Sequence, residues 1–316
     1  MRGFLIQRWF LIALVLALVL GITFAAALQP LSEWKLLRNC IVAAVLFVMA
    51  LPLEARAVVR SMRHPGPPLL ASFVNLGLLP LFAWSVSLLL RGDAATGLLV
   101  AATTPCTLAS ASVWTRRAGG NDTVSILVTV STNSLCFLIT PLWLVVMTGE
   151  SVDRSELSLG RMSLKLGMLV VLPMALAQLL RLHRPLAVWS SQSKVRLGVL
   201  AQCGVLSMIF LGAIRTGVRL QSDDAQALLA WDLVTILAAV NVVHISMLWT
   251  GICLTRWSRF SREDQIAVAF AGSQKTLMVG LLVAISLQVS ILPMVAYHVC
   301  QLFIDTLIAD RFRKKG

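Results

Sequence analysis

One lysine lies in the middle of an apolar segment that is long enough to cross a membrane. The segment is QIAVAFAGSQKTLMVGLLVAIS, Gln265 to Ser286, and Lys275 is its only charged residue. A spanning helix needs about 20 residues, so Lys275 lies about 15 Å from either end, too deep to reach the headgroups. A lysine at this depth costs about 2.5–3.5 kcal/mol. We therefore predict that Lys275 belongs to a substrate or ion site; the alternative is a structural ion pair with Asp305.

Polar side chains near the middle of other apolar segments are candidates for the same site. A buried amide needs several hydrogen-bond partners, which favours Asn75 as a lining residue. Serine and threonine have an alternative role, because in membrane helices they often bond carbonyls of the preceding turn. His298 can equally bond a neighbouring helix, and Asp305 fits a position near the interface as well as one in the core. The candidate binding residues are Asn75, Thr107, Ser110, Ser112, Ser125, Thr129, Ser273, Gln274, Lys275, Thr276, His298 and Gln301.

The composition is that of an integral membrane protein. Hydrophobic residues make up 58% of the chain and charged residues only 13%, so the chain would aggregate in water rather than fold. The net charge of +13 could suggest a nucleic-acid partner. The basic residues are instead distributed as membrane topology requires, so we expect the lipid bilayer and a small molecule as partners and no nucleic acid. Nothing in the sequence indicates the oligomeric state.

Apolar runs predict an all-α polytopic protein with ten spans, at residues 10–27, 39–53, 69–90, 94–115, 123–147, 163–181, 196–214, 229–254, 265–286 and 291–309. With the N-terminus inside, the inner segments hold 18 of the 27 lysines and arginines and the outer segments hold 8. The remaining one is Lys275. This bias predicts that both termini are cytoplasmic. We expect a multi-pass protein of the plasma membrane, which in a bacterium is the inner membrane.

The ten spans divide evenly at the longest outer loop, residues 149–162. Residues 1–148 and 163–316 would then hold five spans each, and an odd number gives the second half the opposite orientation. This is the condition for an inverted repeat. Polar residues at depth are confined to spans three to five and eight to ten. We therefore predict a polar core domain of those six spans beside an apolar panel of spans one, two, six and seven.

The fourth and ninth spans are both interrupted by polar residues near their middle. In the fourth, Pro105 removes a backbone donor and disfavours helix just before it. In the ninth, Gly272 precedes Ser273, Gln274 and Lys275 and is expected to loosen the helix. Interrupted helices at corresponding positions of two halves are the sequence pattern of a transporter binding site.

The chain lacks the residue patterns of intramembrane enzymes. Aspartyl proteolysis needs two membrane aspartates, whereas only Asp305 qualifies, and no GxSxG motif is present. The six cysteines are isolated, so neither a disulfide framework nor a metal site is indicated. We expect no cofactor and no enzyme activity. A ligand-binding membrane sensor or regulator that binds without net transport stays an alternative to a transporter, and a channel is disfavoured because no repeated pore loop is visible.

Two motifs resemble a known family. PCTLASASVWTRRAGGNDTVSILVTVST, Pro105 to Thr132, and FAGSQKT, Phe270 to Thr276, are similar to the bile acid:sodium symporter (BASS/SBF) family. The C-terminal YHVCQLFIDTLIADRFRK resembles its SBF-like branch, which is related to the seventh human member. The resemblance covers essentially the whole chain. It implies ten helices in two inverted five-helix repeats, with the fourth and ninth helices crossing where they are unwound.

The resemblance also implies two sodium sites, both altered here. By motif, Ser110, Ser125 and Thr129 fall on one site, and Asn75 and Gln274 on the other. Ala111 stands where the first site commonly has Asn. The family pattern also has a carboxylate shared by both sites, and that position is Phe270 in this chain. Lys275 stands where the pattern has Asn.

Sodium prefers oxygen ligands, so the loss of the one anionic ligand argues against ordinary sodium coupling. We hypothesise that the Lys275 ammonium takes the place of the cation, which makes coupling sodium-independent or proton-linked through Lys275 itself. A buried cation together with half-helix N-termini favours an anionic substrate. The function predicted from the sequence is therefore secondary active transport of a small organic anion by alternating access.

Overall fold

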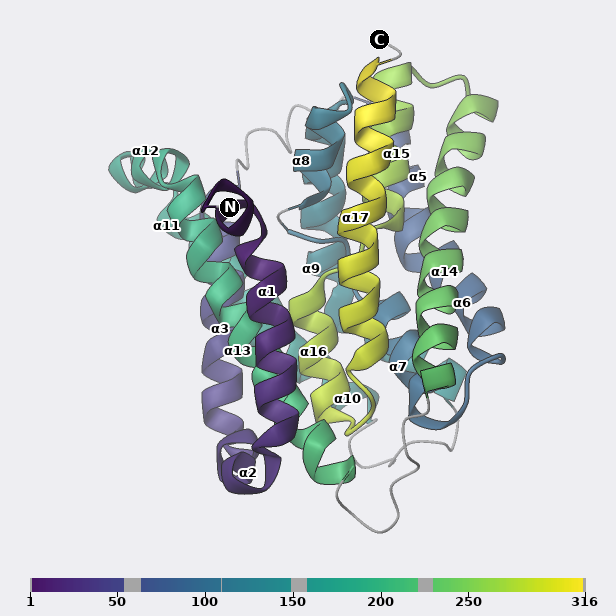
Figure 1. Cartoon of the computed structure of the whole chain (residues 1–316). Helices are drawn as coiled ribbons and strands as arrows, with labels where there is room; N and C mark the ends of the chain where they lie inside the picture. The colour runs from purple at the N-terminus through teal and green to yellow at the C-terminus, as the bar shows by residue number, and fades with distance from the viewer. Residues whose placement is uncertain (1, 54–63, 109, 149–157, 221–229, 315–316) are drawn as a thin grey trace.

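The computed structural model describes residues 2–53, 64–108, 110–148, 158–220 and 230–314, and these parts contain helices and no strands. Seven helices within them are long and apolar enough to cross a membrane, and a bent pair, Trp9–Thr23 with Ala25–Glu33, gives up to eight. The chain is therefore a multi-pass, all-helical membrane protein (Figure 1). Most of the linker expected at 149–162 lies outside the described residues.

In the part of the first half that the structure describes, the chain forms nine helical elements. They are α1 (Arg2–Thr23), α2 (Ala25–Glu33), α3 (Lys35–Ala50), α5 (Gly66–Phe73), the π-helical turn η1 (Val74–Leu78), α6 (Leu79–Ser87), α7 (Gly92–Thr103), α8 (Ser110–Arg117) and α9 (Asp122–Thr148). The second half contains α10 (Leu159–Leu166), the π-helical turn η2 (Gly167–Val171), α11 (Leu172–Leu180), α12 (Arg184–Gln192), α13 (Lys194–Leu220), α14 (Ala230–Trp257), α15 (Arg262–Ser273), α16 (Leu277–Ser286) and α17 (Leu292–Lys314).

The predicted spans correspond to these elements, with differences in length or continuity. The first span was expected to run to residue 27, but α1 ends at Thr23 and the chain bends by 103° into α2. The second corresponds to α3, which has 16 residues. The fourth is not one helix, because α7 ends at Thr103 and α8 begins at Ser110. The count of ten spans and the inverted repeat therefore stay predictions.

Both predicted interruptions lie in the described structure. Thr104 is extended after α7, as expected for the residue before Pro105. The ninth span is broken between α15 and α16, where Gln274 and Thr276 have extended backbones. The prediction that Gly272 loosens this span is wrong in position, because Gly272 lies inside α15. Gly272 instead permits close packing, since a Cβ there would lie 3.1 Å from Val74 Cγ1.

A proline explains the π-helical turn η1. Pro80, near the start of α6, has no N–H to give to the carbonyl four or five residues earlier. The carbonyl of Leu76 instead accepts a hydrogen bond from Trp143 Nε1 at 2.6 Å. The carbonyl of Asn75, five residues before Pro80, accepts one from the Lys275 ammonium at 2.7 Å. The position of this proline thus exposes a backbone oxygen at the depth of the break in the ninth span.

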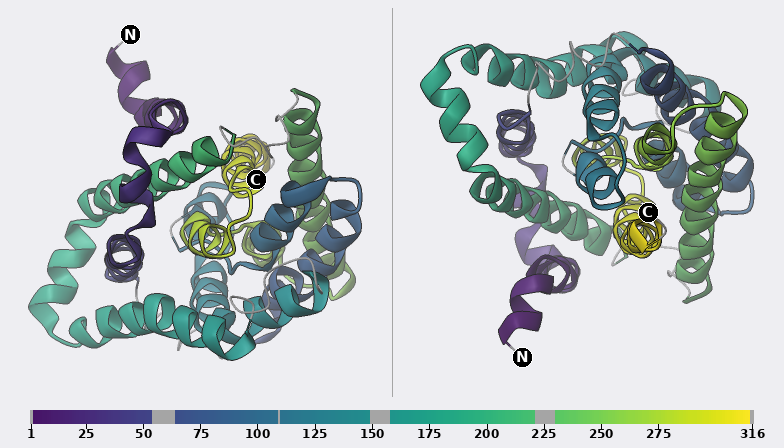
Figure 2. Two further views of the ribbon diagram at one scale, coloured as in Figure 1. Left: turned by 90° about the horizontal axis from the view of Figure 1, so that it is seen from below. Right: turned by 90° about the horizontal axis from the view of Figure 1, so that it is seen from above.

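The helices form two groups in space. Figure 2 shows α1, α3, α11 and α13 on one side of the molecule and α5–α9, α14, α15 and α17 on the other. Helix α13 packs against α1, α2 and α3, while α14 packs against α15 and α17. The division of the chain into a core domain and a panel domain stays a prediction.

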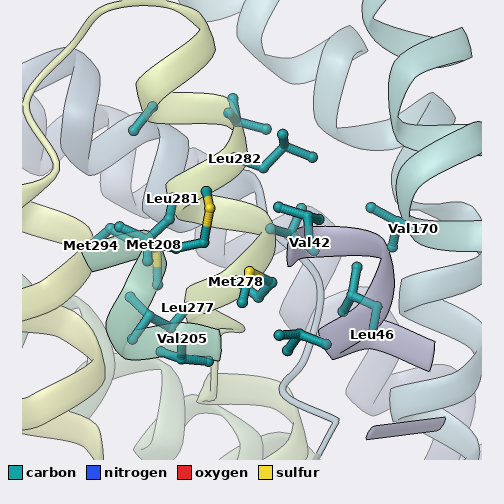
Figure 3. Packing of buried hydrophobic residues seen from close by; sticks show 14 of the residues in the cluster. Val42, Leu46, Val170, Val205, Met208, Leu277, Met278, Leu281, Leu282 and Met294 are labelled. Atoms are coloured by element: carbon teal, nitrogen blue, oxygen red, sulfur yellow. The ribbon is translucent and has the colours of Figure 1, made fainter. Parts of the chain in front are cut away.

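Helix α16 joins the two groups through the largest apolar cluster. Its Leu277, Met278, Leu281 and Leu282 lie against residues of α3 and α13 (Figure 3). A Cβ at Gly280 would lie 2.1 Å from Met294 Sδ, so this glycine allows α17 to pack closely. Residues 266–285 of the span Arg262–Ser286 are all buried, as expected for a helix that is apolar on every face. Helix α16, which is the second half of the broken span, is therefore held by hydrophobic packing.

Candidate functional site

The two helix breaks contact each other in the buried interior. Thr276 N–H donates to the Pro105 carbonyl at 2.9 Å, which links the break after α15 to the break after α7. Ser273, Gln274 and Lys275 are fully buried, and Thr276 is 2% exposed. The last residue of α15 and the three residues between α15 and α16 are thus held away from solvent. Their backbone groups need partners from other elements.

The Lys275 ammonium meets three acceptors. Its Nζ donates to the Asn75 carbonyl at 2.7 Å, to Asn75 Oδ1 at 3.1 Å and to the Thr104 carbonyl at 2.7 Å. An ammonium has three N–H bonds, so all its donors are used. Thr104 directly follows α7, so the charge also lies at the negative end of that helix. The alternative of an ion pair with Asp305 is wrong, because Lys275 takes these partners instead.

The side-chain amide of Asn75 bonds backbone carbonyls at the C-terminal end of α15. Its Nδ2 lies 3.0 Å from the carbonyl of Ala271, 3.3 Å from that of Gly272 and 2.9 Å from that of Gln274. The last carbonyls of a helix have no intrahelical partner. Asn75 therefore closes the C-terminal end of α15 with its amide nitrogen while its two oxygens hold the Lys275 ammonium.

Helix α17 holds the backbone of the break. Gln301 Oε1 accepts from Lys275 N–H at 2.9 Å, and Gln301 Nε2 donates to the Lys275 carbonyl at 3.0 Å. His298 Nδ1 lies 3.1 Å from Gln301 Nε2, so this imidazole supports the clamp. Tyr297 Oη donates to the Ser273 carbonyl at 2.9 Å. One turn of α17 thus bonds the backbone at both ends of the segment from Ser273 to Lys275.

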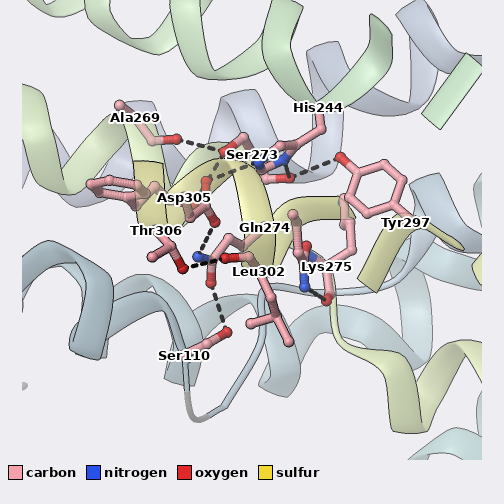
Figure 4. A network of polar contacts seen from close by, with 12 residues as sticks. Ser110, His244, Ala269, Ser273, Gln274, Lys275, Tyr297, Leu302, Asp305 and Thr306 are labelled. Carbon is pink, nitrogen blue, oxygen red and sulfur yellow. Dashed lines mark hydrogen bonds and ion pairs between the residues drawn. The ribbon is translucent and has the colours of Figure 1, made fainter. Parts of the chain in front are cut away.

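A second polar chain runs beside Lys275 (Figure 4). Ser110 Oγ donates to Gln274 Oε1 at 2.9 Å, and Gln274 Nε2 donates to Asp305 Oδ2. The other oxygen of Asp305 lies 2.9 Å from His244 Nε2. Asp305 and His244 are both fully buried, so Asp305 occupies the core rather than the interface. Helices α8, α14 and α17 and the break after α15 all contribute to this chain.

The remaining predicted residues are divided between this site and its surroundings. Thr107 Oγ1 accepts from Ser110 at 3.3 Å, and the Thr107 carbonyl accepts from Thr129 at 3.1 Å, so both support the break after α7. Ser273 Oγ bonds the Ala269 carbonyl at 2.8 Å, the structural role open to serine. Ser125 pairs with Thr115 at 2.7 Å, away from Lys275. Within the described residues, the side chains of Ser112 and Thr276 make no hydrogen bond.

Sequence reasoning left three residues out of the candidate set that the structure brings to it. They are His244, Tyr297 and Asp305. For His244 and Asp305 the signal was present, because an ionisable residue inside a membrane segment is by default a functional candidate. For Tyr297 the sequence held no signal, because only the fold brings its hydroxyl to the Ser273 carbonyl.

The residues at the expected sodium site of Asn75 and Gln274 do not fit a sodium ion in this arrangement. The oxygens of Asn75 accept from the Lys275 ammonium, and Gln274 Oε1 accepts from Ser110. Phe270 lies in an apolar cluster, edge-to-face against Phe312 with ring centroids 6.4 Å apart. The oxygens that a sodium ion would need are thus engaged with protein donors, and the position of the shared carboxylate is apolar.

Comparison with known proteins matches the chain over nearly its whole length. The model of the SBF-like CPA transporter family matches residues 8–314. The chain is 25% identical over 327 residues to sodium/bile acid cotransporter 7-B of Xenopus laevis, covering 97% of this chain and 92% of that protein. It is 25% identical over 329 residues to sodium/bile acid cotransporter 7 of Mus musculus (97% and 93%). It is also 23% identical over 328 residues to the protein YfeH of Escherichia coli strain K12 (100% and 96%).

Proposed function

Because this chain belongs to the SBF-like CPA transporter family, we propose that it moves a small organic anion by secondary active transport with alternating access. The family is one of transporters and not of enzymes. Two of the relatives are named as cotransporters of sodium and bile acid, and a bile acid is an organic anion. The proposal takes from these names only the class of substrate.

The buried Lys275 ammonium is the observation that carries the proposal. It is fully enclosed, and three oxygens lie 2.7–3.1 Å from its Nζ. A cation bound by a protein is surrounded by oxygens in this manner. Lys275 lies two residues before α16, and Ser110, the first residue of α8, bonds the neighbouring Gln274; the N-termini of both half-helices favour negative charge. A buried cation at the contact of two broken helices supports an anionic substrate nearby.

The same geometry supports transport that does not depend on sodium. Lys275 uses oxygens that belong to Asn75 and to the end of α7, at positions where the family pattern implies a cation. We propose that its charge replaces that of the coupling ion, so that transport is either sodium-independent or linked to protons. All three ammonium donors are engaged, so Lys275 would contact substrate only after the breaks rearrange.

The larger architecture follows the family in this proposal. Ten helices form two inverted repeats, residues 1–148 and 163–316, with an outer linker at 149–162 and with the unwound α7–α8 and α15–α16 spans crossing. The group around α14, α15 and α17 moves as a core against the group around α1, α3 and α13. Both termini are cytoplasmic, and the protein lies in a plasma membrane, which in a bacterium is the inner membrane.

Two measurements test the function. A thermal-stability screen of purified protein against organic anions, with cholate among them, identifies a ligand, and radiolabelled ligand then serves for uptake into proteoliposomes. We expect uptake without a sodium gradient and strong loss of uptake in Lys275→Gln. Full transport by this variant, or strict sodium dependence of the wild type, would count against the proposal.

The alternative class is a sensor that binds the ligand without moving it. Counterflow separates the two, because a transporter exchanges labelled ligand for unlabelled ligand inside the vesicle, whereas a sensor binds without exchange. The proposal predicts counterflow that saturates with ligand. Saturable binding with no exchange in sealed vesicles would favour the sensor.

A further inference from the structure

A buried histidine and a buried aspartate form a pair that the proposed role of Lys275 does not use. His244 of α14 and Asp305 of α17 are fully buried, and their Nε2 and Oδ1 atoms lie 2.9 Å apart. The other ring nitrogen of His244, Nδ1, lies 3.3 Å from the Ser273 carbonyl (Figure 4). Ser273 is the last residue of α15. The pair therefore touches the helix break directly.

The hydrogen-bond partners determine how many protons the pair holds. A backbone carbonyl only accepts, so His244 Nδ1 must carry a proton to bond Ser273. The Nε2–Oδ1 contact also needs one proton, either on the imidazole or on the carboxyl group. Both forms have one proton more than a neutral imidazole beside a carboxylate. The arrangement observed is thus the proton-loaded form, with no net charge on the pair.

Asp305 contacts the break on its other side as well. Its Oδ2 accepts from Gln274 Nε2, and Gln274 Oε1 accepts from Ser110 Oγ at 2.9 Å. The pair thus bonds two successive residues of the break, Ser273 through His244 and Gln274 through Asp305. A change in the protonation of the pair changes the partners available to both residues.

Removal of one proton is incompatible with the contacts as they stand. A neutral imidazole has a single N–H. If Nε2 keeps it to bond the carboxylate, the lone pair of Nδ1 faces the Ser273 oxygen at 3.3 Å and repels it. If Nδ1 keeps it, the lone pair of Nε2 faces Asp305 at 2.9 Å. One contact must therefore break, which links the proton occupancy to the geometry of the break.

The other titratable groups around the pair are few. Residues 66–87, which form α5, η1 and α6, contain none, and those of α15 lie at its start, Arg262 to Asp264. On α17, Tyr297 donates to the Ser273 carbonyl and Asp310 pairs with Arg117 near the helix end. The list is completed by His298, Cys300, Arg311, Arg313 and Lys314 on α17, by Asp232, Cys253 and Arg256 on α14, by Asp93 on α7 and Arg116 on α8, and by Cys106 and Lys275 at the breaks.

Among these groups, Lys275 is the cation that can balance a negative pair. It is fully buried two residues after Ser273. Loss of a proton from the pair leaves one buried negative charge, and the ammonium supplies the opposite charge in the same low-dielectric interior. The pair can therefore release its proton to water when the break opens, leaving neutral His244, the Asp305 carboxylate and the Lys275 ammonium.

We propose that His244 and Asp305 form a proton-binding site that is loaded when the α15–α16 break has the geometry observed and releases its proton when the break rearranges. The ligand is the proton, and the carrier is this pair rather than Lys275. The link between the proton and transport rests on the proposed function, whereas the binding of the proton by the pair does not.

Nitrogen NMR of protein labelled at histidine tests proton binding without any transport. The chain has four histidines, and the His244 signals are those that disappear in His244→Gln. We expect the His244 signals to show a protonated Nδ1 in the loaded form and the loss of one proton from the pair as the pH is raised. Asp305→Asn removes or moves this transition, whereas Asp310→Asn, on the same helix, leaves it in place. An Nδ1 in one protonation state throughout, or a transition unchanged by Asp305→Asn, would overturn the proposal.

Uptake into proteoliposomes tests the link to transport. We expect an inward proton gradient to accelerate wild-type uptake and to have no effect in His244→Gln, with His183→Gln, which removes an exposed imidazole, behaving as wild type. Equal acceleration in His244→Gln would overturn the coupling role. If the wild type takes up no ligand, the proposed function fails, while the NMR titration still decides whether the pair binds a proton.

Discussion

At the scale of single residues, Lys275 shows both the reach and the limit of sequence reasoning. One charge in a long apolar segment was enough to predict a buried polar site, because the insertion cost demands compensation. The sequence could not identify the compensating groups. Two of the three acceptors are backbone carbonyls, at Asn75 and Thr104, and every residue has a carbonyl. Asp305, a carboxylate in the tenth predicted span, looked like the partner but lies with His244.

Removing the ammonium should destabilise the fold. Lys275→Met leaves three buried acceptors without a donor, and an unsatisfied buried polar group costs about 1–3 kcal/mol. We expect the thermal midpoint of the purified protein to fall by several degrees. Lys194→Gln, which removes an exposed lysine at the start of α13, serves as the control and should leave the midpoint nearly unchanged. A midpoint equal to that of the wild type in Lys275→Met would contradict the role assigned to the ammonium.

The clamp from α17 makes a second prediction at this scale. Gln301→Leu removes the two side-chain atoms that bond the backbone N–H and carbonyl of Lys275. Each of these buried backbone groups is then unpaired, which costs about 1–3 kcal/mol of folding stability per group. Thr306→Val is the matched control, because Thr306 lies on the same helix and bonds only the Leu302 carbonyl of its own helix. Chemical denaturation should show a clear loss of stability in the first variant and a small change in the second. Equal losses would mean that the clamp is not specific.

At the scale of elements, local rules located the breaks but not every detail of their geometry. The restriction that Pro105 imposes on Thr104 correctly predicted the end of α7. Gly272 was the wrong marker for the second break, because a glycine between well-packed neighbours can remain helical, and Gln274 and Thr276 adopt the extended backbone instead. The π-turn η1 was not predicted. The role of its Asn75 carbonyl also could not be read from the sequence, because the donor to this carbonyl, Lys275, lies 200 residues away.

The proline after η1 should be functionally important. Pro80→Ala restores an N–H that can bond the carbonyl of Leu76 or of Asn75, and so competes with Trp143 or with Lys275. We expect a folded protein with reduced ligand uptake into proteoliposomes. Pro173→Ala is the matched control, because Pro173 follows the π-turn η2 in the same way but lies away from the breaks. Similar uptake in both variants would show that the freed Asn75 carbonyl does not matter.

At the scale of the whole molecule, composition and charge bias predicted a multi-pass helical membrane protein, and the family model and the apolar helices confirm that class. In the structure, α14, α15 and α17 carry His244, Ser273 and Asp305 of the site, while α13 packs against α1 and against α3. The division into core and panel domains stays a prediction. Ser125 shows what the pattern could not supply. It lies on the expected face of α9, but its partner is Thr115 rather than the break.

Topology gives a prediction at this scale. If both termini are cytoplasmic, a cysteine introduced in the C-terminal basic segment should react with a membrane-impermeant thiol reagent only after the inner face is exposed in inverted vesicles. The six native cysteines require a cysteine-free background. Labelling from the outside of intact cells would contradict the proposed orientation.

The central claim is that the Lys275 ammonium stands in place of a coupling sodium ion, and direct sodium binding tests it most simply. Equilibrium binding of radioactive sodium to the purified wild-type protein needs neither the substrate nor a vesicle. The account predicts no saturable sodium binding, because the oxygens of Asn75 and Thr104 are already engaged by Nζ. Saturable, stoichiometric sodium binding to the wild type would contradict it.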